Sequence, residues 1–216
     1  MCRCGLVSTK VKSKNWTKIL NKKSVGKIEL YNENCLDTIK RLGKVDLILT
    51  DPPYPDYLAD EYKYFEGIID FMKDIDCKQL IFWSAKVYFP LNYTSIHIWD
   101  KKCGVGSMYE RIFERNGGNA YKCYNYYLIN STVAASFAKD TFEGHPSQKP
   151  INLIRKLILE YTKEGDTIFD PFSGSGTTAV ACAKENRNFI GSELNKTYYD
   201  KAISRINNQI SKPSLF

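Results

Sequence analysis

Hydrophobic residues recur with two different spacings along the chain from about residue 27 onwards. Short, nearly continuous apolar runs predict buried strands, and apolar residues three and four positions apart predict helices that cover a sheet. The predicted strands span residues 27–31, 45–50, 79–83, 95–99, 121–129, 167–169 and 188–193. The predicted helices span residues 36–42, 62–73, 151–161, 177–184 and 196–210. Strands that alternate with helices in this way predict an α/β fold.

The last predicted helix shows the amphipathic pattern most clearly, as expected for a helix that lies on a sheet. One stripe of its surface carries Tyr199, Ala202, Ile203, Ile206 and Ile210. Residues around 100–146 are less regular. We expect a small insertion there that carries substrate specificity, although an ordinary long loop explains the pattern nearly as well.

Length and composition favour one domain. The chain has 216 residues, 43% of them apolar and 25% charged, which suffices to bury one sizeable core and is short for two. No apolar run approaches the roughly 18 residues that a membrane span needs, and the N-terminus lacks the apolar stretch of a secretory signal. We therefore expect a cytoplasmic protein with no membrane partner.

The seven cysteines are scattered and odd in number, which makes a poor framework for disulfides. Only Cys2 and Cys4 lie close together, and two ligands make at best half of a zinc site. We expect reduced thiols and no bound metal.

The net charge of +7 is concentrated in residues 1–28, which contain no acidic residue. The basic residues of this segment are Arg3, Lys10, Lys12, Lys14, Lys18, Lys22, Lys23 and Lys27. A basic N-terminal arm of this kind suits a polyanion such as nucleic acid, because each neutralised phosphate releases counterions. A solvated tail explains the charge equally well, so residues 1–28 are predicted as an arm and residues 29–216 as the folded domain.

The apolar run at 45–50 leads directly into Asp51-Pro52-Pro53-Tyr54. In open α/β sheets, ligands bind at such strand ends. The two prolines remove two N–H donors and stop the ladder, which leaves rigid, unpaired carbonyls beside the Asp51 carboxylate. A flat heterocycle with an amino group fits these acceptors, with Tyr54 stacked on its face. A proline-stiffened turn with a capping aspartate is the plain structural alternative.

A second strand end carries Asp170-Pro171-Phe172-Ser173-Gly174-Ser175-Gly176-Thr177-Thr178, followed by a helix of small residues. Glycines at 174 and 176 allow a positive φ and a close approach of ligand to backbone, and the helix N-terminus offers free N–H groups. Glu193 ends the next predicted strand, where an acid can accept hydrogen bonds from ribose hydroxyls. This spacing favours a cofactor that contains adenosine over a plain turn.

Three segments together resemble the S-adenosylmethionine-dependent amino-methyltransferases of DNA. They are Asp51-Pro52-Pro53-Tyr54, His145-Pro146-Ser147-Gln148-Lys149-Pro150 and the glycine turn 170–178. The catalytic motif precedes the cofactor motif, which is similar to the β arrangement of that family, and the resemblance covers about residues 27–210. It implies a Rossmann-like methyltransferase sheet of about seven strands with helices on both faces. It also implies S-adenosyl-L-methionine as the cofactor and double-stranded DNA as the partner of a monomer or homodimer.

The resemblance also implies roles for individual residues. Asp51 and the Pro52 carbonyl would accept the two hydrogens of the target amine, beside Pro53, and Tyr54 would stack on the flipped base. Glu193 would bind the cofactor's ribose and Lys149 its methionine carboxylate. The complete set of expected cofactor-binding residues is Asn34, Lys149, Asp170, Phe172, Gly174, Gly176, Thr177 and Glu193.

One position departs from the family pattern. Similar enzymes usually have an aspartate, which contacts the cofactor's adenine amine, where this chain has Asn34. An amide oxygen can accept the same bond without charge, and Glu33 is a possible substitute. Equally, Asn34 can simply cap the helix predicted at 36–42.

Adenine N6 is the expected target, because an aspartate in the first position of the tetrapeptide is commoner in adenine enzymes of the family and a serine in cytosine enzymes. Cytosine N4 methylation of DNA, methylation of RNA adenine, and a nucleic-acid-binding protein that has lost catalysis are the alternatives.

Overall fold

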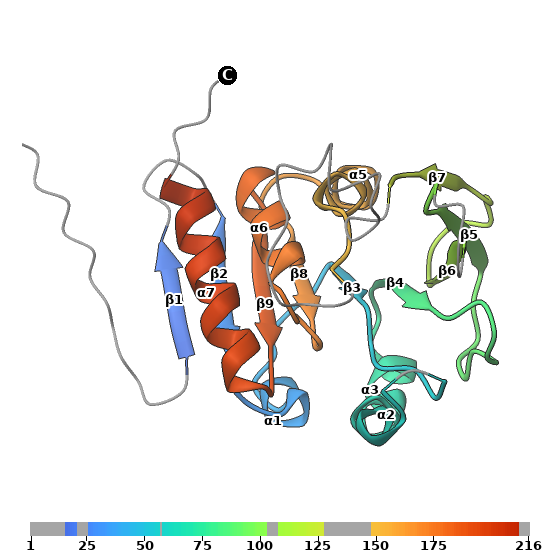
Figure 1. The fold of residues 1–216 in the computed structure, drawn as a ribbon, viewed down its shortest axis with the longest axis horizontal. Helices are drawn as coiled ribbons and strands as arrows, with labels where there is room; N and C mark the ends of the chain where they lie inside the picture. Colours follow the sequence, from blue (N-terminus) through green and yellow to red (C-terminus); the bar gives the residue numbers. More distant parts are fainter. Residues whose placement is uncertain (1–15, 21–25, 57, 103–107, 128–147, 212–216) are drawn as a thin grey trace, which may run out of the picture.

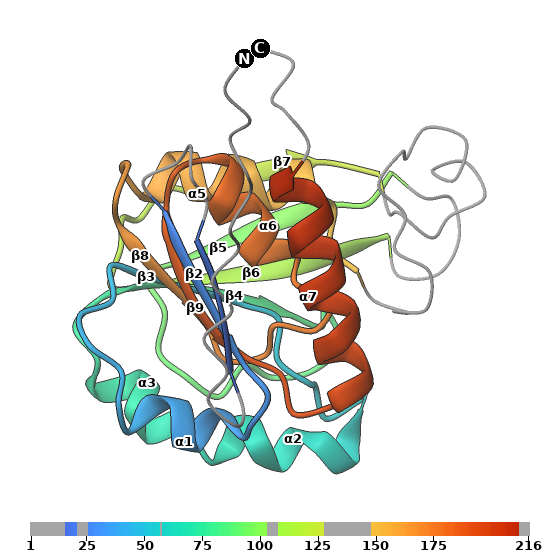
Figure 2. The same cartoon turned by 90° about the vertical axis from the view of Figure 1, so that its left-hand side faces the viewer.

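The computed structural model describes residues 16–20, 26–56, 58–102, 108–127 and 148–211, and these build one mixed sheet with helices on both sides (Figures 1 and 2). Nine strands of this part lie in the order β1-β2-β9-β8-β3-β4-β6-β5-β7. Their bounds are β1 (Trp16–Leu20), β2 (Lys27–Tyr31), β3 (Leu47–Thr50), β4 (Lys78–Trp83), β5 (Ser95–Asp100), β6 (Tyr109–Arg115), β7 (Cys123–Asn125), β8 (Thr167–Asp170) and β9 (Asn188–Ser192). The five strands from β2 to β4 in this order are parallel to one another.

The central strands are apolar at successive positions because both of their faces are buried, as is usual for parallel sheets. In β3, Leu47 and Leu49 point into one core, and Ile48 between them points into the other. The first core is covered by α5 (Ile151–Tyr161), α6 (Thr177–Lys184) and α7 (Lys196–Ser211). The second is covered by α1 (Cys35–Ile39), α2 (Ala59–Glu66) and α3 (Ile69–Asp74). The predicted α/β architecture is therefore confirmed.

All seven predicted strands are present in the described part of the chain. The sheet gains β1 and β6. Four of the seven residues of β6 are charged, which hides its strand pattern in the sequence. Inside the protein these charges have partners: Glu114 Oε2 lies 2.7 Å from His97 Nε2, and Arg115 donates to Gln79 Oε1 at 2.9 Å.

The helix predicted at 62–73 is two helices, α2 and α3, and the first already begins at Ala59. Gly67 ends α2, and Ile68 precedes α3 with a φ of −106° and a ψ of 1°. Phe65 and Met72, one from each helix, are fully buried in the same core. The apolar pattern therefore continues across a break in the backbone.

Part of the predicted basic arm belongs to the sheet. β1 pairs antiparallel with β2, from Trp16 opposite Tyr31 to Leu20 opposite Lys27. Residues 1–15 and 21–25 lie outside the described residues, so an independent arm stays a prediction. In the expected insertion at 100–146, β6 and β7 are strands of the main sheet, and residues 103–107 and 128–147 lie outside the described part.

The chain changes direction across the sheet between β8 and β3. β8 leads through α6 to β9 on one side, and β3 leads through α2 and α3 to β4 on the other. The carboxyl ends of β8 and β3 therefore border a crevice in which α/β proteins bind ligands.

Among the described residues, no helix is both long enough and apolar enough to cross a membrane. Cys35, Cys77, Cys123 and Cys182 are free thiols, and Cys2, Cys4 and Cys103 lie outside the described part.

Candidate active site

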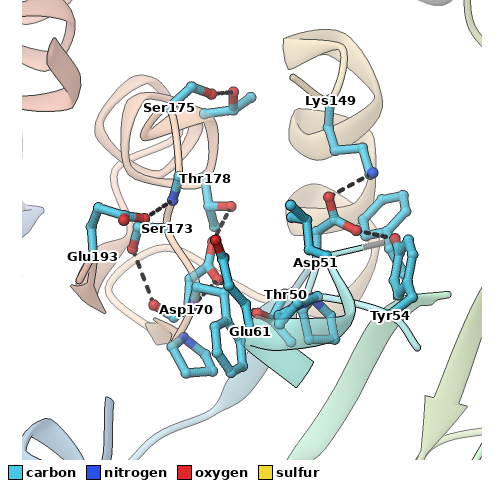
Figure 3. A pocket seen from close by; sticks show the side chains of 18 of the residues that line it. Thr50, Asp51, Tyr54, Glu61, Lys149, Asp170, Ser173, Ser175, Thr178 and Glu193 are labelled. Atoms are coloured by element: carbon cyan, nitrogen blue, oxygen red, sulfur yellow. Dashed lines mark hydrogen bonds and ion pairs between the residues drawn. The ribbon is translucent and has the colours of Figure 1, made fainter. Parts of the chain in front are cut away.

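A cavity of about 740 Å³ opens at the carboxyl edge of the sheet. Its wall includes the ends of β2, β3, β8 and β9, together with the segment before α5. Figure 3 shows two groups of side chains in it: Asp51, Tyr54 and Lys149 on one side, and Asp170, Ser173 and Glu193 on the other. Every predicted site residue lines this cavity except Gly176.

Asp51 follows β3 directly, and both of its carboxylate oxygens have protein partners. The hydroxyl of Tyr54 donates to Oδ1, and Lys149 Nζ lies 2.6 Å from Oδ2. The Tyr54 ring packs edge-on against Trp83 with 5.3 Å between the ring centroids, so its position is fixed. Burial raises the pKa of Asp51, and the Lys149 ammonium opposes this shift. The two predicted catalytic side chains are therefore joined to each other.

Lys149 is bound by two carboxylates, because Nζ also lies 3.0 Å from Glu110 Oε2. Glu110 is the second residue of β6, and its other oxygen lies 2.7 Å from Nζ of Lys101, which follows β5. Burial alone would lower the pKa of Lys149, but Asp51 and Glu110 outweigh it and raise that pKa. Burial alone would raise the pKa of Glu110, but the two lysines outweigh it and lower that pKa.

Sequence reasoning missed Glu110 and Lys101. Neither belongs to one of the three motifs, and β6 was not predicted as a strand. The expected contact of Lys149 with a cofactor carboxylate stays a prediction. In the structure, Lys149 is paired with two carboxylates of the protein itself.

The glycine turn has the backbone that its sequence predicts. Gly174 has a φ of 49° and Gly176 a φ of 73°, both in the left-handed region that glycine tolerates best. A Cβ on Gly176 would lie 3.1 Å from the Cβ of Ala202 on α7, and the Gly176 N–H donates to the Ser173 carbonyl at 2.8 Å. Gly176 therefore serves the turn and the packing of α7. It lies between Ser175 and Thr177, which line the cavity, and its expected contact with a cofactor stays a prediction.

Glu193 lies at the end of β9 as predicted, and it faces the turn. Its Oε2 accepts the Gly174 N–H at 2.9 Å and its Oε1 accepts the Asn195 N–H at 2.7 Å. Burial raises the pKa of Glu193 to about 7, although these two hydrogen bonds oppose the shift. Each carboxylate oxygen has a second lone pair, so the side chain can still accept from a ligand hydroxyl.

Asp170 connects the two sides of the cavity. It is 3% exposed and accepts from Thr50 Oγ1 and Thr178 Oγ1, each at 2.8 Å, and from the Phe172 N–H at 3.2 Å. Thr50 is the residue before Asp51, so this carboxylate links the end of β3 to the glycine turn. Burial raises the pKa of Asp170 to about 6. Its expected contact with a cofactor stays a prediction.

Thr177 is held by Arg205, a buried residue of α7 that the sequence did not single out. The Arg205 guanidinium donates to Thr177 Oγ1 at 2.8 Å and to the Ser175 carbonyl at 3.0 Å. Its position three residues after Ala202, on the apolar stripe, is the only sequence signal that it lies inward. Phe172 lies between the turn and α2, with its ring centroid 6.3 Å from that of Phe65.

Asn34 caps α1, as one of its two predicted roles required: its Oδ1 accepts the Leu36 N–H at 3.0 Å. It also lines the cavity, so a contact with a cofactor stays open as a prediction. Glu33, the possible substitute for Asn34, accepts from Thr38 Oγ1 at 2.6 Å and from the Arg41 guanidinium. Its carboxylate therefore already has two partners within the protein.

Comparison with known families decides the class of protein. The sequence model of the family described as DNA methylase (N6_N4_Mtase) matches residues 76–204. The chain belongs to this family.

Two curated relatives and one solved structure illustrate how closely known proteins resemble this chain. The type II methyltransferase M2.DpnII of Streptococcus pneumoniae is 38% identical over 104 residues, which cover 43% of this chain and 39% of that protein. The DNA adenine methyltransferase YhdJ of Escherichia coli K12 is 25% identical, over 75% of this chain and 76% of that protein. The crystal structure of the M1.HpyAVI complex with S-adenosylmethionine (SAM) has a TM-score of 0.61 at 23% identity. It covers 83% of this chain and 99% of its own. This last likeness shows that the two chains share a fold.

Proposed function

We propose that this DNA methylase transfers a methyl group from S-adenosylmethionine to the N6 amino group of an adenine flipped out of double-stranded DNA. One observation carries the proposal. A single cavity has the acceptors of the Asp51 tetrapeptide on one side and the Glu193 carboxylate at the glycine turn on the other. The Asp170 carboxylate joins these two sides through Thr50 and Thr178.

The donor set on the Glu193 side fits the cofactor. A cavity of about 740 Å³ lies within the usual range for small-molecule sites. The Glu193 carboxylate can accept a ribose hydroxyl, and the Asn34 amide, at the N-cap of α1, offers an uncharged partner for an adenine edge. The Phe172 side chain and the Gly174 backbone supply an apolar, closely fitting floor. When bound, S-adenosylmethionine supplies an electrophilic methyl group on a sulfonium.

The Asp51 side fits an amine. The lone pair of an adenine amino nitrogen is delocalised into the ring, so the amine is a weak nucleophile. Asp51 and the Pro52 carbonyl accept its two hydrogens, which localises the lone pair and fixes its direction. After transfer the nitrogen loses one proton, and the Asp51 carboxylate is placed to receive it. Tyr54 supplies an aromatic surface for the flipped base.

We propose adenine and not cytosine as the target base for two reasons. The tetrapeptide begins with Asp51, and a relative aligned over 75% of this chain is named a DNA adenine methyltransferase. The family name covers both N6 and N4 enzymes, so cytosine N4 is the second candidate.

The test of this proposal is product identification. The protein is incubated with methyl-labelled S-adenosylmethionine and, separately, with duplex DNA and structured RNA, and each nucleic acid is digested to nucleosides. Labelled N6-methyladenine from DNA is expected. N4-methylcytosine would overturn the base assignment, label in RNA alone would overturn the substrate, and no label in either would indicate a binding protein.

A further inference from the structure

We propose that Lys149 and Glu110 are positioning residues that fix the Asp51 carboxylate for the target amine. Glu110 and its partner Lys101 thereby extend the active site beyond the motifs of the sequence. This inference rests on the proposed function, because Asp51 needs an amine to act on.

The contacts of Asp51 leave its carboxylate little freedom. Oδ1 accepts the Tyr54 hydroxyl, and Oδ2 lies 2.6 Å from Lys149 Nζ. Two partners on two different oxygens fix both the position and the plane of the group. An acceptor that is already oriented avoids reorganisation when the amine arrives, which is where such sites gain most of their rate.

Lys149 is itself held on several sides. Its ammonium lies between Asp51 and Glu110 and also faces two aromatic rings, at 5.2 Å from the Phe82 centroid and 5.7 Å from that of Trp99. The side chain is 9% exposed, so these contacts replace most of its water. A desolvated ammonium is stable only when such partners surround it.

Glu110 balances this arrangement. A single buried lysine beside Asp51 would form an isolated pair and compete with the amine for the carboxylate. Glu110 shares the Lys149 charge from a second strand and is anchored by Lys101 Nζ at 2.7 Å. The two carboxylates and two ammonium groups together carry no net charge, so the cluster can be buried without a strong field of one sign.

The same geometry argues against the methionine carboxylate as the partner of Lys149. A third carboxylate would place three negative groups around one buried ammonium. Glu110 would then repel the cofactor it should help to bind. Glu110 therefore supports Lys149 as a partner of Asp51 and disfavours Lys149 as a partner of the cofactor carboxylate. A variant of Glu110 distinguishes these two roles of Lys149.

The experiment compares Lys149→Met, Glu110→Gln and the double variant with wild type. Lys156→Met, which removes a half-exposed lysine of α5, serves as the matched control. For each protein we would measure S-adenosylmethionine affinity by calorimetry, and the single-turnover rate of methyl transfer at saturating cofactor. Thermal unfolding checks that each variant is folded.

We expect each single variant to lose about 10- to 100-fold in rate, as supporting residues of active sites do, with cofactor affinity within about twofold of wild type. The double variant should lose little more than either single one, because both act on the same carboxylate.

A second readout needs no nucleic acid. The ionisation of Asp51 can be followed by carboxylate ¹³C NMR, with Asp51→Asn to assign the signal. The groups that face Asp51 are Tyr54 on its own loop, Lys149 before α5, Glu110 on β6 with Lys101 behind it, and Asp170 on β8. Removing the Lys149 cation should raise the Asp51 midpoint, and removing the Glu110 anion should lower it.

Three outcomes would overturn the proposal. The first is a large loss of cofactor affinity in Lys149→Met together with an unchanged rate in Glu110→Gln, which would make Lys149 a cofactor ligand. The second is an unchanged rate in both variants of an active enzyme, and the third is an Asp51 midpoint that moves the same way in both. If wild type methylates no nucleic acid, the proposed function fails by itself, and the NMR midpoints still decide whether the cluster controls Asp51.

Discussion

At the scale of single residues, the site is made of carboxylates whose surroundings give them different tasks. Burial raises the pKa of both Asp170, to about 6, and Glu193, to about 7. Asp170 has three protein donors and connects two elements, whereas Glu193 has two and faces the turn. The Asp170 carboxylate therefore connects two elements of the structure, and the Glu193 carboxylate is a candidate cofactor ligand.

Glu193 gives a prediction with a pH dependence. The ionised carboxylate is the better acceptor for ribose hydroxyls, and the pKa of Glu193 is about 7. Cofactor affinity should therefore fall as the pH is lowered from 8 to 6. Glu193→Gln should bind more weakly at pH 8 and lose that dependence, while the transfer rate at saturating cofactor changes little. Calorimetry at several pH values checks this, and a wild-type affinity that is flat across the range would contradict it.

Motif residues could be predicted from the sequence, but their supporting residues could not. Asp51 and Glu193 follow recognisable apolar runs, so their place at the sheet edge was predictable. Glu110 and Arg205 contact segments far from them in the chain, such as Arg205 with Ser175. No local pattern marks Glu110, and the apolar stripe of α7 indicates only that Arg205 lies inward.

At the scale of elements, strands were predicted wherever burial on both faces produced an apolar run, as in β3. β6 was missed because its charges are paired inside the protein, with Glu114 beside His97 as the clearest case. α2 and α3 were merged because the backbone breaks without interrupting the apolar pattern. Hydrophobic periodicity shows which residues are buried. It predicts helix and strand boundaries only where the pattern of burial changes at those boundaries.

The glycine turn gives a prediction at this scale. Gly176→Ala places a methyl group at a φ of 73° and 3.1 Å from Ala202, whereas Gly165→Ala meets a φ of 84° with nothing within 4 Å. The second variant should lose about 1–2 kcal/mol of unfolding free energy from strain alone. The first should lose roughly 1–3 kcal/mol more from overpacking against α7. Gly43→Ala, with neither feature, is the control. Urea denaturation measures the unfolding free energy of all three variants. Equal losses for Gly176→Ala and Gly165→Ala would mean that α7 shifts to make room for the added methyl group at no cost, which would contradict the prediction.

At the scale of the whole molecule, the sheet brings together strand ends that are far apart in the sequence. Thr50 and Asp170 are 120 positions apart and bonded at 2.8 Å. The fold thereby places the Asp51 tetrapeptide and the glycine turn, to which we assign the amine and the cofactor, in one cavity. β1, which is part of the basic N-terminal segment, lies beyond β2 in the strand order.

The charge of that segment gives a prediction for DNA binding. Because β1 belongs to the sheet, a truncation should remove only residues 1–15, with Arg3, Lys10, Lys12 and Lys14. If these residues bind phosphates, their removal weakens binding to all DNA sequences alike and leaves the methylated site unchanged. The slope of log K against log salt should become shallower by about 0.9 for each phosphate that the truncated protein no longer neutralises. Replacing the four basic residues by Gln is the matched control, and parallel salt lines for full-length and truncated protein would exclude the role.

The central claim is that Asp51 acts on the target amine while the other side of the cavity holds the cofactor. The most direct measurement compares Asp51→Ala with wild type in single-turnover methyl transfer to DNA and in calorimetric binding of S-adenosylmethionine, with the exposed Asp70→Ala as control. We predict a loss of at least 10²–10³ in transfer rate with cofactor affinity nearly unchanged. An Asp51→Ala protein that keeps more than about a tenth of the wild-type rate, or that loses transfer only because it no longer binds cofactor, would contradict the account.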